Sequence, residues 1–304
     1  MMLEVKMRSA LWALRSDRLS ALLDGLTSGD WPRAGPPPRQ TQPQRSGIRI
    51  LRLHGVLTQR EMVHPIFGPL DGTALDQVGL DLKAAAADPA VDQVLLEIDS
   101  PGGEVAGVRE LAALIRETRG SKPVVAIANS EASSAGYWLG AQADEFFATT
   151  GGMVGGVGVY RAHEDLSKAM EMEGVHITFI SAGKYKVEGN PFAPLNEAAR
   201  RHMQYEVDEV HNAMLADIGK GRAMAVDTVR RTFGQGRVLR PEQAKTAGMI
   251  DGVLTIDQVL QRMQRASRVT RPGANPAAMS PQMRHNHALL AIAEGGARQT
   301  GAMR

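Results

Sequence analysis

The chain of 304 residues contains no cysteine, and this absence excludes several classes of protein. Without thiols there is no disulfide scaffold, no cysteine nucleophile and no cysteine-ligated zinc or iron–sulfur centre, and the chain suits a reducing compartment. The sequence also lacks a continuous apolar run of about 18 residues, the length that a membrane-spanning helix needs. Charges interrupt the apolar positions of residues 1–30, so we expect no signal peptide and no secretion.

An excess of charge of one sign is missing as well, because 35 Lys and Arg face 33 Asp and Glu. The net charge of +2 nevertheless hides a division: residues 1–46 carry +3, residues 47–262 carry −6 and residues 263–304 carry +5. Basic charge therefore belongs to the two ends, and the acidic centre argues against nucleic-acid binding by the folded part.

With 43% hydrophobic and 22% charged residues, the composition is that of a globular protein. Leucines at helical spacing predict an N-terminal amphipathic helix within residues 1–30, and five prolines make residues 31–46 a linker. Residues 47–265 alternate between strand and helix patterns and form the expected folded domain. Residues 266–304, rich in Arg, Ala, Gly and Pro, are predicted to be a basic flexible tail.

The alternation within the folded domain predicts an α/β fold whose strands are largely parallel. Strands are expected at 48–53, 94–98, 124–128, 146–148, 157–159 and 175–180. Helices are expected at 73–87, 104–119, 134–143, 163–173, 196–220, 225–233, 241–247 and 256–265.

Two strand-to-helix corners carry residues suited to chemistry. The first, Asp-Ser-Pro-Gly-Gly at 99–103, follows a buried strand, and its paired glycines let another chain approach the backbone closely. The backbone N–H groups there can hold a developing oxyanion. The plainer interpretation is a tight turn between a strand and a helix.

The second corner, residues 128–138, brings Ser133 and Ser134 to the start of a short helix. A serine hydroxyl at a helix N-terminus is well placed to attack a carbonyl, because the helix dipole favours the negative charge that develops. The plainer interpretation is that either serine caps the helix.

A nucleophilic serine needs a base, and the sequence offers four candidates. His163 and His176 lie beyond the second corner, and Lys184 and Lys186 follow the strand expected at 175–180. Lysine has an ordinary pKa of about 10.4, and it serves as a base only where burial disfavours the ammonium form. The local sequence does not decide between the histidines and the lysines.

The glycine cluster at 151–158 does not form a nucleotide site, because neither a P-loop nor a complete G-x-G-x-x-G pattern is present. Close backbone packing, or an edge along which an extended peptide lies, explains these glycines better. No H-E-x-x-H motif occurs, and we expect neither a metal nor another cofactor.

In this order, the two corners, the glycine cluster and Lys-Val-Glu-Gly-Asn-Pro at 186–191 resemble the signal peptide peptidase A family, serine peptidase family 49. The resemblance covers residues 47–253. Within the family, the sequence at 186–191 is most similar to the capsid-maturation proteases of tailed phages, of the lambda head protease type. The fold that it implies is the βαβ superhelix shared by Clp protease and crotonase. The lack of a membrane-spanning run favours the phage proteases over membrane-anchored signal peptide peptidases.

Carried over residue by residue, the resemblance implies a Ser-Lys dyad in which Ser134 is the nucleophile and Lys186 the general base. The backbone N–H groups of Gly103 and Ala135 would stabilise the oxyanion, although Ala135 stands where the family commonly has glycine. An extended substrate would pair with residues near the first corner and in the glycine cluster, namely Gly102, Val105 and Val157.

The resemblance implies a serine endopeptidase that processes capsid, scaffold or portal proteins, works as a homo-oligomer and needs no cofactor. Such an enzyme would act in the bacterial cytoplasm or inside the procapsid, where its basic ends would attach to an assembling particle. Four alternatives stay open: a Ser134–His163–acid triad as in Clp protease, an α/β-hydrolase esterase, a host signal-peptide or quality-control peptidase, and a non-catalytic head scaffold protein.

Overall fold

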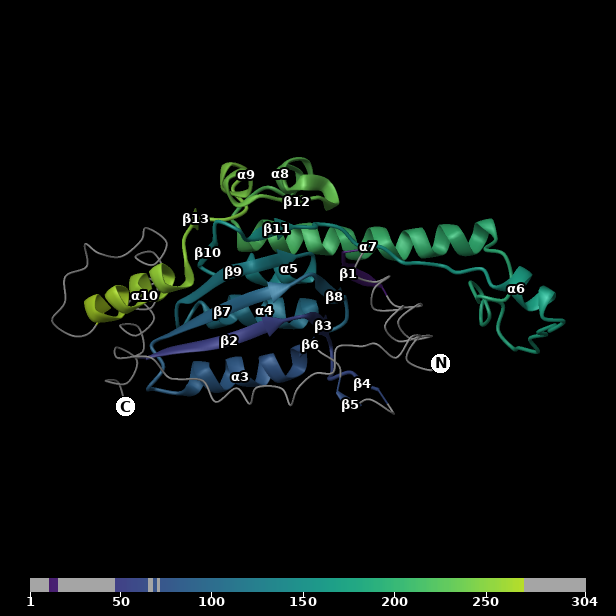
Figure 1. Cartoon of the computed structure of the whole chain (residues 1–304), viewed down its shortest axis with the longest axis horizontal. Helices are drawn as coiled ribbons and strands as arrows, with labels where there is room; N and C mark the ends of the chain where they lie inside the picture. Colours follow the sequence, from purple (N-terminus) through teal and green to yellow (C-terminus); the bar gives the residue numbers. More distant parts are fainter. Residues whose placement is uncertain (1–10, 16–46, 65–67, 70–71, 271–304) are drawn as a thin grey trace, which may run out of the picture.

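The computed structural model describes residues 11–15, 47–64, 68–69 and 72–270, and its centre is a sheet of parallel strands (Figure 1). In spatial order these strands are β2 (Ile48–His54), β7 (Gln93–Ser100), β9 (Val124–Ser133), β10 (Glu145–Ala148) and β13 (Gly252–Val253). The last residues of β9 pair with the parallel β11 (Met153–Gly155), which in turn pairs with the antiparallel β12 (Val238–Leu239). The end of β9 therefore stays anchored in the sheet until the chain turns into the next helix.

A second, smaller sheet begins where β7 ends. Its strands, in order, are β1 (Trp12–Leu14), β8 (Gly102–Glu104), β3 (Val56–Thr58) and β6 (Gly72–Ala74). β1 is antiparallel to β8, whereas β8 and β6 are each parallel to β3. A two-stranded hairpin, β4 (Val63–His64) and β5 (Gly68–Pro69), follows β3. The Pro-Gly-Gly corner thus leads from the large sheet into the small one.

Helices pack on both faces of the large sheet (Figure 1). They are α3 (Leu75–Ala87), α4 (Val108–Thr118), α5 (Ala135–Gly140), α6 (Ser167–Met172), α7 (Glu197–Gly221), α8 (Val226–Thr232), η1 (Gly234–Gly236), α9 (Pro241–Thr246) and α10 (Ile256–Thr270). Alternate side chains of β7 take opposite sides: Val94, Leu96 and Ile98 join the cluster of α3 and α4, whereas Leu95 joins that of α10. Burial on both faces explains why this strand reads as a nearly continuous apolar run.

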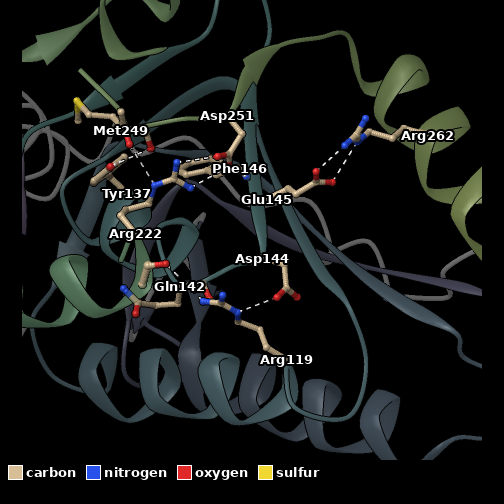
Figure 2. A network of polar contacts seen from close by, with 12 residues as sticks. Arg119, Tyr137, Gln142, Asp144, Glu145, Phe146, Arg222, Met249, Asp251 and Arg262 are labelled. Atoms are coloured by element: carbon tan, nitrogen blue, oxygen red, sulfur yellow. Dashed lines mark hydrogen bonds and ion pairs between the residues drawn. The ribbon is translucent and has the colours of Figure 1, made fainter. Parts of the chain in front are cut away.

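Polar contacts tie α5 to the C-terminal part of the domain (Figure 2). The Arg222 guanidinium donates two hydrogen bonds to the Asp251 carboxylate at 2.8 and 2.9 Å, and Asp251 also accepts from the Phe146 N–H at 2.7 Å. The Tyr137 hydroxyl donates to the Met249 carbonyl oxygen at 3.0 Å, and burial raises the pKa of Tyr137. The Tyr137 hydrogen bond fixes the short helix α5 to this part of the domain, although six residues of helix have little stability of their own.

The predicted α/β class with largely parallel strands is confirmed, but the predicted N-terminal helix is wrong at residues 12–14, which form β1. Backbone pairing with β8 on one side and with Tyr160 on the other outweighs the helical spacing of the leucines there. Residues 1–10 and 16–30 of that predicted helix, the linker at 31–46 and residues 271–304 of the predicted tail lie outside the described residues.

The domain boundary predicted at residue 265 is also too early. Helix α10 continues to Thr270, and Ala266 and Ser267 are buried against the sheet. The Gln93 side-chain amide in β7 donates to the Met263 carbonyl oxygen at 2.8 Å, which adds a polar tie between sheet and helix. The folded domain therefore extends at least to Ser267, because the buried face of this helix continues to cover the sheet up to that residue.

Residues 161–195, called the arm below, run from Tyr160 to the start of α7 and carry α6 (Figure 1). The arm extends past the N-terminal end of α7, away from the sheets. The strand predicted at 175–180 is not formed, and this segment is exposed. The strand predicted at 157–159 is absent too, and β11 lies just before it. Apolar alternation predicts a strand, but a strand forms only where a second strand pairs with it.

Candidate active site

Ser134 stands between β9 and α5 in a backbone conformation that residues other than glycine seldom adopt. Its φ is 57° and its ψ is −114°, and the residue is only 2% exposed. The Ser134 N–H donates to the Gly155 carbonyl oxygen at 2.7 Å, and the Ser134 side chain makes no capping hydrogen bond to α5. Backbone strain of this kind persists only where the surroundings enforce it, and it clusters at functional sites. The capping interpretation therefore does not account for Ser134.

Two glycines provide the space that this conformation needs. Gly102 has a φ of +103°, and a Cβ there would lie 2.9 Å from the Ser134 Cβ. Gly156 has a φ of +61°, and a Cβ there would lie 3.1 Å from the Ser134 nitrogen. A larger residue at either position would be strained and would press on the serine. The first corner and the glycine cluster, far apart in sequence, thus meet at Ser134.

The other residues that the sequence predicted for the site lie in or beside the two corners and in the glycine cluster. Gly103 is the central residue of β8, and Val105 comes directly after that strand. Ala135 is the fully buried first residue of α5. Val157 is buried and lines the same cavity as Ser134.

Ser134 opens onto a cavity of about 720 Å³. The walls come from residues 14–15, from residues 156–160, from α7, from α8 and from the segment between α8 and β12. Leu215, Val229 and Phe233 give one wall a buried apolar surface. The Ser134 hydroxyl donates to the Gly158 carbonyl oxygen at 3.5 Å. A cavity of this size with one apolar wall beside the serine hydroxyl suits a ligand that inserts a side chain.

His211 of α7 also lines this cavity, and the sequence did not point to it. Burial lowers the pKa of His211, the neighbouring Arg230 guanidinium lowers it further, and Asp208 opposes the shift. The lowered pKa favours the neutral form of the imidazole that lines the cavity. The only signal in the sequence was its position in the helix expected at 196–220, and helical spacing does not separate a cavity wall from a core.

The structure does not bring Lys186 to Ser134 within one chain. Lys186 is exposed in the arm. The arm contacts α7 near Met203, since a Cβ on Gly189 would lie 2.1 Å from the Met203 Cε. Met203 and the cavity residue Leu215 are separated by about 18 Å along the helix, at 1.5 Å per residue. The predicted base thus belongs to a different part of the molecule from the predicted nucleophile.

The alternative bases lie in the arm as well. The His163 Nε2 is 3.2 Å from the Asn190 carbonyl oxygen, and His176 is exposed. The Lys184 Nζ lies 5.0 Å from the centroid of the Tyr185 ring. Within the described part of one chain, no histidine or lysine side chain forms a hydrogen bond with the serine.

Among the described residues, no group of three or more His, Asp or Glu side chains is arranged to hold a metal ion. Over the same residues, every helix is too short or too polar to cross a lipid bilayer.

Comparison with known proteins gives relatives that share this framework. Capsid assembly protease C of Escherichia phage lambda is 32% identical over 232 residues, which are 75% of this chain and 52% of the relative. Head-tail preconnector protein GP5 of Enterobacteria phage P21 is 32% identical over 224 residues, which are 73% of this chain and 43% of the relative. Protease 4 of Haemophilus influenzae is 24% identical over 193 residues, which are 62% of this chain and 31% of the relative. The chain thus spans about half the length of the two phage relatives and about a third of the length of Protease 4.

A family model, that of Peptidase family S49, matches residues 116–270, which is half of the chain. The matched region includes the strained serine, the glycine cluster, the arm and the cavity walls on α7 and α8. On this match, the chain belongs to Peptidase family S49.

Proposed function

We propose that the chain is a serine endopeptidase in which Ser134 is the nucleophile. One observation carries the proposal: a nearly buried serine with a left-handed backbone lies between two close-packed glycine turns and opens onto a cavity. A structural serine would not require this strain, whereas a nucleophile held at a sharp turn between strand and helix does.

Lys186 is the proposed general base, and we propose that a neighbouring copy of the chain supplies it. Within one chain Lys186 is exposed in the arm, which extends past the N-terminal end of α7, away from the sheets (Figure 1). Of the ten large apolar side chains that are exposed among the described residues, six lie in the arm. They are Met172, Val175, Ile177, Phe179, Ile180 and Tyr185. An apolar, projecting segment of this kind suits contact with a second copy, in a homo-oligomer whose symmetry would complete every site.

The proposed reaction uses only groups of the protein and water. Lys186, in its neutral form, takes the Ser134 hydroxyl proton while the serine oxygen attacks a peptide carbonyl. The backbone N–H groups of Gly103 and Ala135 stabilise the oxyanion, and the lysine ammonium then protonates the leaving amine. Water, activated by the same lysine, hydrolyses the acyl-enzyme. No cofactor takes part.

The proposed substrates are capsid, scaffold or portal proteins of a phage head, cut in the bacterial cytoplasm or inside the procapsid. The names of the two phage relatives support this assignment. Similarity to Protease 4 makes a host signal-peptide or quality-control peptidase the second candidate. A non-catalytic head scaffold protein is the third, and only the loss of hydrolysis would favour it.

The test is to incubate the chain and its Ser134→Ala variant with casein and with the purified major capsid protein of a tailed phage, and to follow cleavage by gel and mass spectrometry. We expect hydrolysis by the chain and none by the variant, with unchanged circular dichroism. Equal hydrolysis by both proteins would exclude Ser134 as the nucleophile. Hydrolysis of casein without any cut in the capsid protein would instead favour the host peptidase.

A further inference from the structure

Strand β1 is paired along both of its edges, although it belongs to a segment far from the rest of the domain in sequence. On one side the Val105 N–H donates to the Leu11 carbonyl oxygen at 3.1 Å, and the Arg15 N–H donates to the Pro101 carbonyl oxygen at 3.2 Å. On the other side Trp12 exchanges two hydrogen bonds of 3.0 Å with Tyr160. Both neighbours are antiparallel to β1. The segment therefore fills a slot between two backbone edges, as an extended peptide does when it adds a strand.

The register of this pairing brings one particular carbonyl to Ser134. Ala13 lies opposite Gly103, and the alternation of an antiparallel ladder turns the Ala13 backbone polar groups toward β8. A Cβ on Gly102 would lie 2.1 Å from the Ala13 carbonyl oxygen and 2.9 Å from the Ser134 Cβ. The Ala13 carbonyl and the serine thus border the same small space, which exists because residue 102 is glycine.

The side chains of the segment are accommodated as those of a bound ligand are. Trp12 and Ala13 are fully buried, and Leu14 is 3% exposed. Leu14 and Arg15 line the cavity onto which Ser134 opens. The Arg15 guanidinium donates to the Glu131 carboxylate at 3.1 Å, at the end of β9. An ordinary edge strand is paired along one side only, whereas β1 is paired along both. Sheet pairing alone also does not explain why the Ala13 carbonyl lies beside the strained Ser134.

We propose that residues 11–15 occupy the substrate groove as an internal substrate, and that the bond cut in this segment is Ala13–Leu14. The inference rests on the proposed peptidase function. The Ser134 oxygen bonds to the Ala13 carbonyl carbon, the bond to the Leu14 nitrogen breaks, and that nitrogen takes the proton that the serine lost. Water then cleaves the ester, which leaves a carboxylate on Ala13 and an amine on Leu14.

Two consequences follow from the fit of this segment. Until it is cut or displaced, the segment competes with other substrates for the groove. It also indicates the preferred sequence: a large aromatic residue, then a small residue whose carbonyl is attacked, then leucine and a basic residue. The small residue is required because Ala13 is fully enclosed next to Gly102.

The test measures the intact mass and the N-terminal sequence of the full chain, freshly purified and after incubation. The Ser134→Ala variant serves as the uncut reference, and Ala13→Gly and Ala13→Trp form a matched pair. We expect a product that begins at Leu14 for the chain and for Ala13→Gly. In Ala13→Trp we expect this cut to slow by about 100-fold or more, because a bulky residue displaces the reacting carbonyl.

A casein assay on the same samples separates the two proposals. In Ala13→Trp the segment no longer fits the groove, so we expect casein cleavage at least as fast as that by the uncut chain. Casein cleavage without a cut at Ala13–Leu14, or with a cut at another bond of the N-terminal segment, would overturn the inference and leave the proposed function standing. Loss of both activities in the unsubstituted chain would overturn both proposals.

Discussion

The corner that holds Ser134 and the arm that holds Lys186 are built in opposite ways. Around the corner nearly every side chain is buried. The Tyr137 hydroxyl donates to the Met249 carbonyl oxygen, and the Arg222 guanidinium pairs with the Asp251 carboxylate. In the arm, Ile180 is fully exposed and Lys186 is exposed. The fold of one chain thus determines the position of the proposed nucleophile, whereas the position of the proposed base depends on contacts outside that chain.

The largest expected effect comes from removing the base. Lys186→Ala should lower the rate of peptide hydrolysis by about 10³-fold or more, because the serine proton then has no acceptor. The same substitution should leave the midpoint of thermal unfolding unchanged, since the side chain is exposed in one chain. Initial rates on casein, with calorimetry on the same protein, measure both.

Lys184→Ala is the matched control, because Lys184 is also exposed and lies two residues away. It should retain most of the activity. A large loss in Lys184→Ala with little loss in Lys186→Ala would exchange the roles of the two lysines.

A large effect on stability, rather than on chemistry, is expected at the corner. Asp251→Ala leaves the nearly buried Arg222 guanidinium and the Phe146 N–H without their shared acceptor. Loss of the acceptor of a nearly buried guanidinium costs about 2–3 kcal/mol of unfolding free energy, which denaturant titration measures. Glu197→Ala, which breaks an exposed ion pair with Arg200, should leave the unfolding midpoint unchanged. Equal effects of the two substitutions would contradict the contrast between a tightly held corner and a solvated surface.

A smaller effect is expected from the apolar surface of the arm. Ile180→Ser should weaken self-association by about tenfold, as loss of one interface anchor does, without lowering the unfolding midpoint. Sedimentation velocity over a range of concentrations measures the change. Leu80→Ser is the control, because Leu80 is also exposed but lies on α3. Equal weakening by both would remove the arm from the interface.

The smallest effect concerns the pH dependence of stability. Burial and Arg230 lower the pKa of His211 in the folded chain, so the unfolded chain binds this proton more readily. The contribution of His211 to the free energy of unfolding is complete above about pH 6.5, the pKa of histidine in the unfolded chain. This contribution is lost as the pH falls toward the lower pKa of His211 in the folded chain. His211→Gln should therefore reduce the loss of stability between pH 7.5 and 5.5, by less than about 1 kcal/mol. An unchanged pH dependence in this variant would mean that the imidazole is freely solvated.

The sequence predicted the corner well because its signals are local. The buried strand before Ser134, the serine itself and the Pro-Gly-Gly turn are all consequences of short-range pattern and backbone freedom. The pairing of Gly102 and Gly156 around the serine was not predictable, because nothing local relates two turns more than fifty residues apart.

The wrong predictions also have their cause in contacts between residues far apart in the sequence. Leucine spacing at the N-terminus predicted a helix, but the slot between β8 and Tyr160 holds residues 12–14 as a strand. The alternation at 175–180 predicted a strand, but the chain supplies no partner for it within the described residues. His211 was missed because only the tertiary fold brings α7 to the cavity.

The most direct test of the central claim mixes two inactive proteins. Ser134→Ala and Lys186→Ala, each purified alone, are combined in equal amounts, allowed to exchange subunits and assayed on casein. If the base comes from a neighbouring copy, activity should return to about a quarter of that of the unsubstituted chain, since one site in four then pairs an intact serine with an intact lysine. A mixture that exchanges subunits and stays inactive would show that serine and lysine act within one chain.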